Sequence, residues 1–89
     1  MHAYKITVKG LVQGVGFRYF CYKEAEIYGI KGYVKNLING DVEILAEGDD
    51  GIINDFIESV KRGPRYSRVN SISLVEIKYE NKYDTFSIY

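Results

Sequence analysis

The sequence predicts an α+β fold in which two helices cover one face of an antiparallel sheet. Three observations favour this class: short segments with alternating apolar residues, two segments with helical apolar spacing, and glycine-containing turns between them. The chain has 89 residues, of which 46% are hydrophobic. This length suffices for one compact core and leaves no room for a second, so we expect residues 1–89 to form a single domain.

The first two predicted elements are a strand and a helix, separated by a glycine-rich turn. Tyr4, Ile6 and Val8 alternate with polar residues, which is the period-two pattern of a strand with one buried face. After the turn, four apolar residues recur at spacings of four, four and three, as on one face of a helix. These residues are Phe17, Cys21, Ala25 and Tyr28. Gly29 follows at a position where it ends this helix.

A β-hairpin is predicted next, with its turn at Asn39-Gly40. Asn-Gly is a strong hairpin signal because both central positions of the turn tolerate positive φ. The strand over residues 30–38 places four residues on the face that we expect to turn toward the helices. They are Ile30, Gly32, Val34 and Asn36. The strand after the turn alternates in the same way, with Val42, Ile44 and Ala46 on its apolar face.

A second amphipathic helix and two strands complete the chain. The helix follows an aspartate pair at residues 49–50, which favours a helix start through the helix dipole, and it ends before the Gly-Pro break at residues 63–64. Its apolar face consists of Ile53, Phe56, Ile57 and Val60. Residues 71–79 and 84–89 have the pattern of strands. The order strand, helix, strand, strand, helix, strand, with a final strand or extension, predicts a ferredoxin-like βαββαβ sandwich.

The charge and hydropathy of the chain exclude several classes of function. Twelve Lys and Arg residues balance twelve Asp and Glu residues, so the formal net charge is zero. Because a duplex-binding protein normally carries net positive charge, we expect no nucleic-acid partner, and any anion site must be local. No segment approaches the ~20 apolar residues that cross a bilayer, so we expect a cytoplasmic protein without a membrane partner.

Cysteine and histidine each occur once, which excludes further chemistries. With Cys21 alone, the chain forms no internal disulfide and no zinc cluster of thiolates. A Ser-His-Asp or Cys-His arrangement would have to recruit His2 from the chain terminus. Cys21 lies on the apolar stripe of the first predicted helix, so we expect it to be a small core residue.

The segment GLVQGVGFR, residues 10–18, lies between the first predicted strand and the first predicted helix. Unpaired backbone N–H groups and the helix dipole favour an anion at a helix N-terminus. The glycines at positions 10, 14 and 16 let an anion approach main-chain amides without meeting a Cβ. Arg18 adds a planar donor fork suited to phosphate. A tight turn followed by a solvated arginine is the alternative, and these residues alone leave both interpretations open.

Two known nucleotide motifs do not fit this segment. A Walker loop requires a lysine and a hydroxyl residue after GxxxxG, and the chain has neither at that spacing. A dinucleotide fingerprint would begin at Gly14 and Gly16, but Tyr19 stands where its third glycine belongs. Nucleotide binding by either route is therefore disfavoured.

The same segment resembles the acylphosphatase family. The resemblance begins with VQGVGFR at residues 12–18, and it continues in the same order over nearly the whole chain. Its further matches are GYVKN at 32–36, NG at 39–40, VE at 42–43, AEG at 46–48, GP at 63–64 and FSIY at 86–89. Leu11 and Tyr33 depart from what many members carry at these positions. The family has the ferredoxin-like fold, which agrees with the predicted element order.

The resemblance implies hydrolysis of the carboxyl-phosphate bond of acyl phosphates to a carboxylate and inorganic phosphate. In the family, the arginine that ends the motif binds phosphate and an asparagine on the second strand orients the attacking water. By motif these roles fall on Arg18 and Asn36. The amides that would complete the phosphate cradle belong to Gln13, Gly14, Val15, Gly16, Phe17 and Arg18. The expected partners are an acyl phosphate substrate and inorganic phosphate as product and inhibitor, with a monomeric chain.

So small a set of residues suits this chemistry. The leaving carboxylate has a conjugate-acid pKa of about 4, by analogy with Glu, so its departure needs little general acid catalysis. Phosphoryl transfer depends mainly on positioning and on stabilisation of the phosphoryl oxygens, so no cofactor and no metal are expected. Asn36 shares the buried face of Val34, where an amide needs a partner. The alternative for Asn36 is a strand-end residue that enters the hairpin turn.

Two other functions stay open as alternatives. RNA-binding modules share the element order, and Lys31–Tyr33 begins like their longer consensus, but Val34 and Lys35 depart from it. A non-catalytic acylphosphatase-like domain, such as the N-terminal domain of hydrogenase-maturation carbamoyltransferases, belongs to a far longer chain. Because this chain begins with Met1 and ends on the family's terminal strand, we expect the free-standing enzyme.

Overall fold

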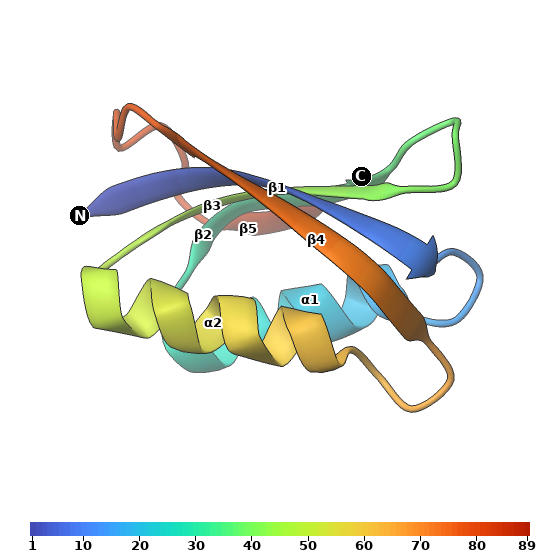
Figure 1. Ribbon diagram of the computed structural model, residues 1–89. Coiled ribbons are helices and arrows are strands. Elements are labelled where there is room, and N and C mark those ends of the chain that lie inside the picture. Colours follow the sequence, from blue (N-terminus) through green and yellow to red (C-terminus); the bar gives the residue numbers. More distant parts are fainter.

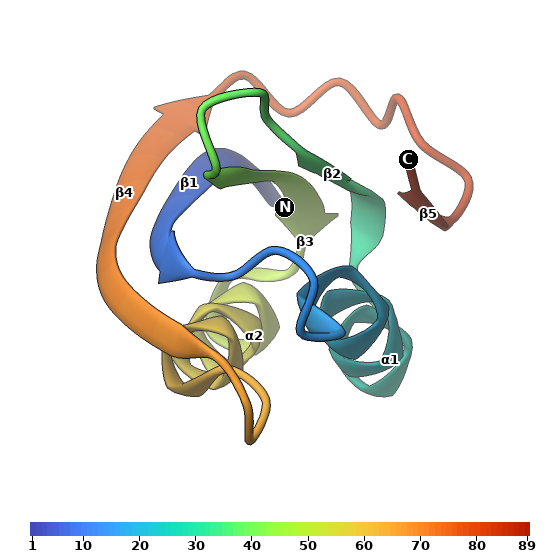
Figure 2. The same ribbon diagram turned by 90° about the vertical axis from the view of Figure 1, so that its right-hand side faces the viewer.

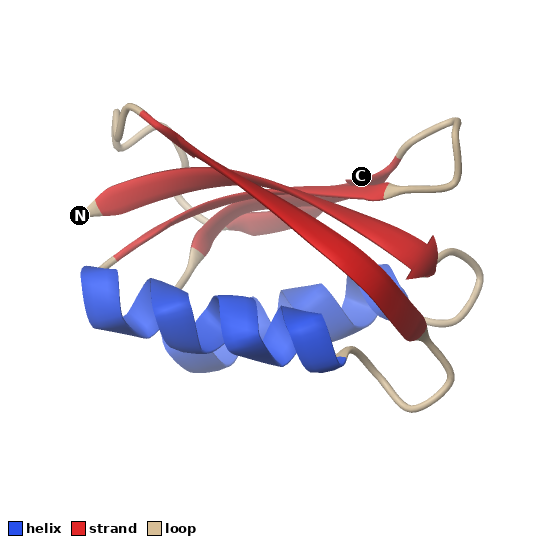
Figure 3. Ribbon diagram, viewed as in Figure 1, coloured by secondary structure: helices blue, strands red, loops and turns tan.

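A computed structural model describes all residues from 1 to 89, which form a sheet packed on two helices (Figures 1 and 3). The elements are β1 (His2–Leu11), α1 (Phe17–Tyr28), β2 (Lys31–Asn36), β3 (Val42–Gly48), α2 (Asp50–Arg62), β4 (Arg68–Ile77) and β5 (Phe86–Ile88). Both helices lie on the same face of the sheet (Figure 1). The strand order is β4-β1-β3-β2-β5, which confirms the ferredoxin-like class.

The sheet is mixed, whereas the sequence predicted an antiparallel one. Strands β4, β1, β3 and β2 pair antiparallel, but β5 pairs parallel with β2. The reason is the long connection after β4, which crosses the sheet from one edge to the other (Figure 2). It delivers β5 to the free edge of β2 in the same direction as β2. Of the predicted segment 84–89, only Phe86–Ile88 forms a strand.

The core lies between the sheet and the helices as one contiguous cluster. The first three strands contribute alternate residues to it, as their periodicity predicted: Ile6, Val8, Val34, Val42, Ile44 and Ala46. The helices contribute Phe17, Cys21, Ala25, Ile53, Phe56, Ile57 and Val60. Cys21 is fully buried, which confirms its prediction as a core residue, and this burial raises the pKa of its thiol. Neither helix is long and apolar enough to cross a membrane.

The β2–β3 hairpin forms as predicted, but its turn is wider than a two-residue Asn-Gly turn. The strand β2 ends at Asn36, and the Leu37 amide donates a hydrogen bond of 2.8 Å to the carbonyl oxygen of Asp41. A type I′ turn needs positive φ at both central residues, and Asn39 does not have it. Instead, the side-chain oxygen of Asn39 accepts a 3.0 Å hydrogen bond from the Asp41 amide, as in an Asx turn.

Gly10 has a structural position within β1, outside the loop in which it was expected to help hold an anion. The register between β1 and β4 shifts at residues 9–10, where Gly10 has a φ of 139°. A Cβ on Gly10 would overlap the main-chain oxygen of Arg68 in β4. Gly10 therefore permits a bulge that keeps β4 paired with β1 as far as Leu11. Because of this pairing, β4 begins at Arg68, earlier than the predicted start at residue 71.

We expect Gly10→Ala to lower the free energy of unfolding by about 2 kcal/mol or more, because the new Cβ meets main-chain atoms and φ is positive. The measurement is urea unfolding followed by circular dichroism. Gly51→Ala in α2 is the matched control, since a Cβ there has no neighbour within 4 Å. It should leave stability unchanged or raise it by up to about 1 kcal/mol. Equal effects of both substitutions would contradict the structural role of Gly10.

Candidate active site

The loop between β1 and α1 and the β2–β3 turn lie at the same end of the sheet (Figure 1). In this loop, Gly14 and Gly16 have φ values of 74° and 79°, in the left-handed region that favours glycine. Gly16 is also the N-cap of α1, which no side chain caps. Since a Cβ at either glycine would have no neighbour within 4 Å, the space above this main chain is open.

The main-chain amides of this loop are unpaired. Residues 12–16 lie outside any helix or strand, and none of their N–H groups donates a hydrogen bond within the chain. Counting from residue 12, the first amide that donates a main-chain hydrogen bond is that of Phe20, which donates to the Gly16 oxygen at 3.0 Å. The unpaired donors stand at the positive end of the α1 dipole. This arrangement is typical of an anion-binding helix N-terminus.

A hollow of about 250 Å³ opens beside the loop. Its lining residues are Val12, Gly14, Gly16, Phe17, Arg18, Tyr19, Asn36 and Ile88. The hollow thus brings together Arg18 and Asn36, which the sequence singled out from segments far apart. Of the predicted cradle, Gly14, Gly16 and Phe17 also line it, whereas Gln13 and Val15 do not. The side chain of Val15 packs against the core instead.

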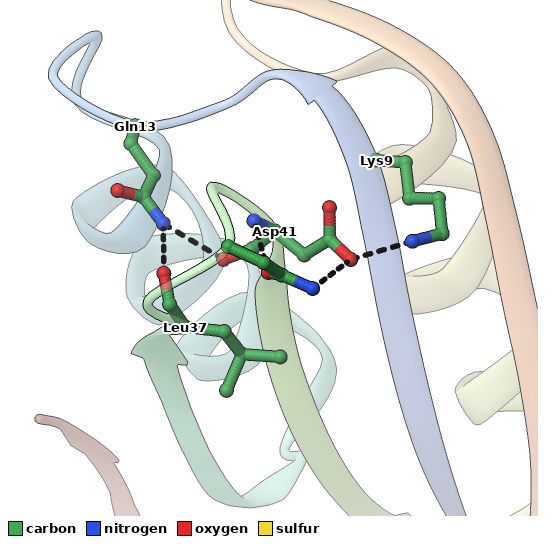
Figure 4. Close-up of polar contacts among 5 residues, drawn as sticks. Lys9, Gln13, Leu37 and Asp41 are labelled. Atoms are coloured by element: carbon green, nitrogen blue, oxygen red, sulfur yellow. Dashed lines mark hydrogen bonds and ion pairs between the residues drawn. The ribbon is translucent and has the colours of Figure 1, made fainter.

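The side chain of Gln13 ties the loop to the β2–β3 turn (Figure 4). Its Nε2 donates hydrogen bonds to the main-chain oxygens of Leu37, at 2.8 Å, and Asp41, at 2.9 Å. Leu37 directly follows Asn36, so these bonds fix the loop relative to the asparagine. The sequence analysis assigned Gln13 to the cradle through its amide and missed this role of its side chain.

Asp41 stabilises the turn that receives Gln13 (Figure 4). Its carboxylate accepts hydrogen bonds from Lys9 Nζ, at 2.7 Å, and from Asn39 Nδ2, at 3.2 Å. Asp41 is only 8% exposed, and a carboxylate this buried needs such donors. The turn is therefore held to β1 through Lys9 as well as to the loop through Gln13.

Arg18, in the first turn of α1, is oriented by the C-terminal segment. Its Nη1 donates a 2.6 Å hydrogen bond to the main-chain oxygen of Tyr89. Tyr89 is itself held on β2, because its amide donates to the Val34 oxygen at 2.9 Å. Its ring also lies 5.4 Å from that of Tyr33, between ring centroids. One donor of the guanidinium is thus engaged, and the others remain for a ligand in the hollow.

Tyr33 is anchored by a charged network on the open face of the sheet. Its hydroxyl donates a 2.8 Å hydrogen bond to Glu43, whose carboxylate lies 3.5 Å from both Lys5 and Lys35. Burial alone would raise the pKa of Glu43, but the Tyr33 hydrogen bond and the two ammonium groups outweigh it and lower this pKa. Burial and the same hydrogen bond raise the pKa of Tyr33, so its hydroxyl stays protonated.

Asn36 is the last residue of β2 and lies on the same face as Val34, as predicted. The sequence analysis required a partner for its amide, but the buried Oδ1 atom has no hydrogen-bond partner in the chain. An unsatisfied buried acceptor destabilises a fold by about 1–3 kcal/mol. This oxygen is therefore available to a donor that enters the hollow.

Comparisons with known proteins agree on one family. The sequence model of the family described as Acylphosphatase matches residues 4–88. The chain is 47% identical to the acylphosphatase of Bacillus subtilis over 88 residues, which are 99% of this chain and 97% of that protein. The crystal structure of acylphosphatase from Bacillus subtilis superimposes with a TM-score of 0.96 at 46% identity, and the match covers 100% and 99% of the two chains.

A second kind of protein contains a similar unit. The crystal structure of HypF from T. kodakarensis matches with a TM-score of 0.87 at 39% identity. That match covers 100% of this chain but only 12% of the HypF chain.

We expect Gln13→Ala to lower the free energy of unfolding by about 1–3 kcal/mol, because it removes two hydrogen bonds between the loop and the turn, each of which contributes about 0.5–1.5 kcal/mol. Urea unfolding measures the change. Asn54→Ala, on the exposed side of α2, is the control and should stay within about 0.5 kcal/mol. A Gln13 effect no larger than that of Asn54 would show that the loop does not depend on these two bonds.

We also expect the stability of Tyr33→Phe to depend on pH in a defined direction. The folded-state pKa of Glu43 is lowered, so its stabilisation is present above the unfolded pKa and is lost as pH falls through the folded one. Tyr33→Phe should therefore lower the free energy of unfolding by about 1.5–3 kcal/mol at pH 7, and by less at pH 3. Urea unfolding at both pH values tests this, with Tyr66→Phe as control; a loss that grows toward pH 3 would contradict it.

Proposed function

The chain belongs to the acylphosphatase family, and we propose that the hollow beside the glycine loop is where it hydrolyses acyl phosphates. As an acylphosphatase, it is a hydrolase that cleaves the carboxyl-phosphate bond. One observation supports this location above all. Unpaired loop amides, the only charged lining residue and an unsatisfied amide oxygen meet in a single hollow.

The loop and Arg18 hold the phosphate group in this proposal. The amides from Gln13 to Arg18 are the proposed cradle, and those of Gly14, Gly16, Phe17 and Arg18 belong to residues that line the hollow. Gly14 and Gly16 keep side chains out of the way of the phosphate oxygens. The guanidinium donates charge-assisted hydrogen bonds to these oxygens, and it does so from a fixed orientation because Tyr89 holds it. The positive end of the α1 dipole adds to the attraction.

Asn36 orients the attacking water. Its Oδ1 accepts a hydrogen bond from one O–H of the water, which directs the lone pair of the water oxygen toward phosphorus. A water in this place also supplies the partner that Oδ1 lacks within the chain. The hydrogen bonds from Gln13 to the turn beside Asn36 keep this water and the phosphate at a constant separation.

The reaction is a displacement at phosphorus. The water oxygen forms a new bond to phosphorus while the bond from phosphorus to the carboxyl oxygen breaks, and the carboxylate leaves with the electron pair. The proton of the water passes to the phosphate product or to solvent. Negative charge on the phosphoryl oxygens is stabilised by the amides and Arg18, so we propose that no metal and no other cofactor takes part.

Two observations disfavour the alternative functions. The Bacillus subtilis acylphosphatase matches along nearly the full length of both chains, whereas the likeness to HypF covers a small part of that protein. The open sheet face, where an RNA-binding module stacks bases, places the carboxylate of Glu43 between Lys5 and Lys35 and against the hydroxyl of Tyr33. A face with paired charges of both signs does not favour a polyanion.

We propose further properties of the chain as a whole. Residues 1–89 act as a single domain and as a monomer, which the one contiguous core supports. The chain works in the cytoplasm and binds neither nucleic acid nor membranes. The balance of twelve basic and twelve acidic residues supports the absence of a nucleic-acid partner.

We expect the purified protein to hydrolyse acetyl phosphate without added metal, with inorganic phosphate as a competitive inhibitor. Two substitutions separate the proposed roles. Arg18→Gln should lower kcat/KM by about a hundredfold or more and weaken phosphate inhibition with it, because the same groups hold substrate and product. Asn36→Ala should lower kcat to a similar extent while the inhibition constant of phosphate stays within about threefold, because it removes only the water's acceptor.

Arg65→Gln and Asn54→Ala are the matched controls, since both side chains are exposed and lie outside the hollow. Circular dichroism confirms that each variant is folded. Full activity of Arg18→Gln would remove Arg18 from the site, and an equal loss of turnover and phosphate binding in Asn36→Ala would indicate a structural role for Asn36.

A further inference from the structure

We infer that Tyr19 and Ile88 form an acyl-binding subsite at the mouth of the hollow, and that the enzyme prefers acyl phosphates whose acyl group is apolar and uncharged. This inference rests on the proposed function, because it requires the phosphate to lie in the loop cradle. It adds a substrate class and two specificity-determining residues to the roles that the resemblance implies for Arg18 and Asn36.

Tyr19 and Ile88 are large apolar residues on the surface, and both line the hollow. Tyr19 is 61% exposed and Ile88 is 42% exposed. They come from opposite parts of the chain, the first turn of α1 and the strand β5, and meet only because β5 pairs with β2. Tyr19 lies off the buried face of α1, so its side chain is not needed for the core.

The geometry of the reaction directs the acyl group toward these two side chains. In phosphoryl transfer the attacking and leaving oxygens lie roughly in line across phosphorus. The water is held at Oδ1 of Asn36, which is buried. The leaving carboxylate therefore points away from this buried oxygen and toward the exposed rim of the hollow. Tyr19 and Ile88 are the only side chains with apolar bulk on that rim, because the remaining exposed lining residues are Gly14 and Gly16.

The size of the hollow supports contact between a large acyl group and the side chains of Tyr19 and Ile88. Its volume of about 250 Å³ lies below the ~300–1,000 Å³ of most small-molecule sites. A phosphate group with a short acyl group fills such a space. A larger acyl group, such as benzoyl, has to extend across the side chains of Tyr19 and Ile88 and removes apolar surface of both from water.

The charges of the lining residues determine which acyl groups are favoured. Arg18 is the only charged residue of the lining, and we assign it to the phosphate. A second negative charge on the acyl group would meet no cation there and would lose part of its hydration against the apolar rim. An apolar, uncharged acyl group gains contact without this penalty.

The experiment compares three substrates in the wild type and in Tyr19→Ala and Ile88→Ala. The substrates are acetyl, benzoyl and 4-carboxybenzoyl phosphate, of which the last two differ by one charge. The wild type should show a kcat/KM at least about tenfold higher for benzoyl than for 4-carboxybenzoyl phosphate. Each substitution should raise the KM for benzoyl phosphate about threefold to tenfold, because Tyr19→Ala removes an aromatic contact with the benzoyl ring and Ile88→Ala an aliphatic one. In both variants the KM for benzoyl phosphate should rise more than that for acetyl phosphate. In Tyr19→Ala, which does not alter β5, the inhibition constant of inorganic phosphate should stay within about twofold.

Tyr66→Ala and Ile52→Ala are the controls, because each removes an exposed side chain of the same type outside the hollow. Neither should change the ratio of the KM values for benzoyl and acetyl phosphate. If Ile88→Ala is unfolded by circular dichroism, Tyr19→Ala alone decides, since its side chain lies outside the core.

Two results would overturn the acyl subsite while leaving the proposed function intact. They are an unchanged benzoyl-to-acetyl KM ratio in the folded variants, and a wild-type kcat/KM for 4-carboxybenzoyl phosphate equal to that for benzoyl phosphate. A wild type that hydrolyses none of the three substrates would overturn the proposed function and the subsite together.

Discussion

The hydrogen bonds from Gln13 to the β2–β3 turn are the interaction on which the geometry of the site depends. The loop follows β1, whereas Asn36 ends β2, and β3 lies between these strands in the sheet. Two bonds from one amide nitrogen, to Leu37 and Asp41, connect the loop to the turn. Because Asp41 is held in turn by Lys9, the loop is joined to both strands that flank β3. The proposed phosphate cradle and the proposed water acceptor are thus joined by hydrogen bonds into one unit.

The unpaired polar groups at the hollow explain why the loop needs to be held in place. Main-chain donors and buried acceptors are normally satisfied in a folded protein, and each exception destabilises it. Here the unpaired amides of Gly14 and Gly16 and the buried oxygen of Asn36 belong to residues that line the same hollow. A flexible loop would turn these groups toward each other or toward solvent. The bonds from Gln13 oppose that rearrangement, so groups that destabilise the free chain remain available to the phosphate and the water of the proposed reaction.

Local patterns were sufficient to predict some of this site, while other parts depend on contacts between distant segments. Asn36 could be placed on the buried face because strand periodicity extends from Val34, and the loop could be placed at a helix start because glycine follows a strand. The width of the hairpin could not be predicted, since the Asx bond of Asn39 replaced the expected two-residue turn. The contact between Arg18 and Tyr89 was also missed, because the pattern of residues 84–89 predicts a strand but does not show that this strand pairs with β2.

The two parts of the proposed phosphate site, the loop amides and the guanidinium of Arg18, therefore depend on different contacts. The amide cradle depends on glycine conformations and on the start of α1, which are local and form with the helix. The guanidinium of Arg18 depends on Tyr89, and hence on a short edge strand held by few main-chain bonds to β2. Edge strands of this length open more readily than a packed core. Fraying of β5 would therefore release Arg18 from its acceptor and move Ile88 away from the hollow, while the amides stayed in place. In the proposed mechanism, phosphate affinity and acyl preference therefore both depend on the docking of the C-terminal segment.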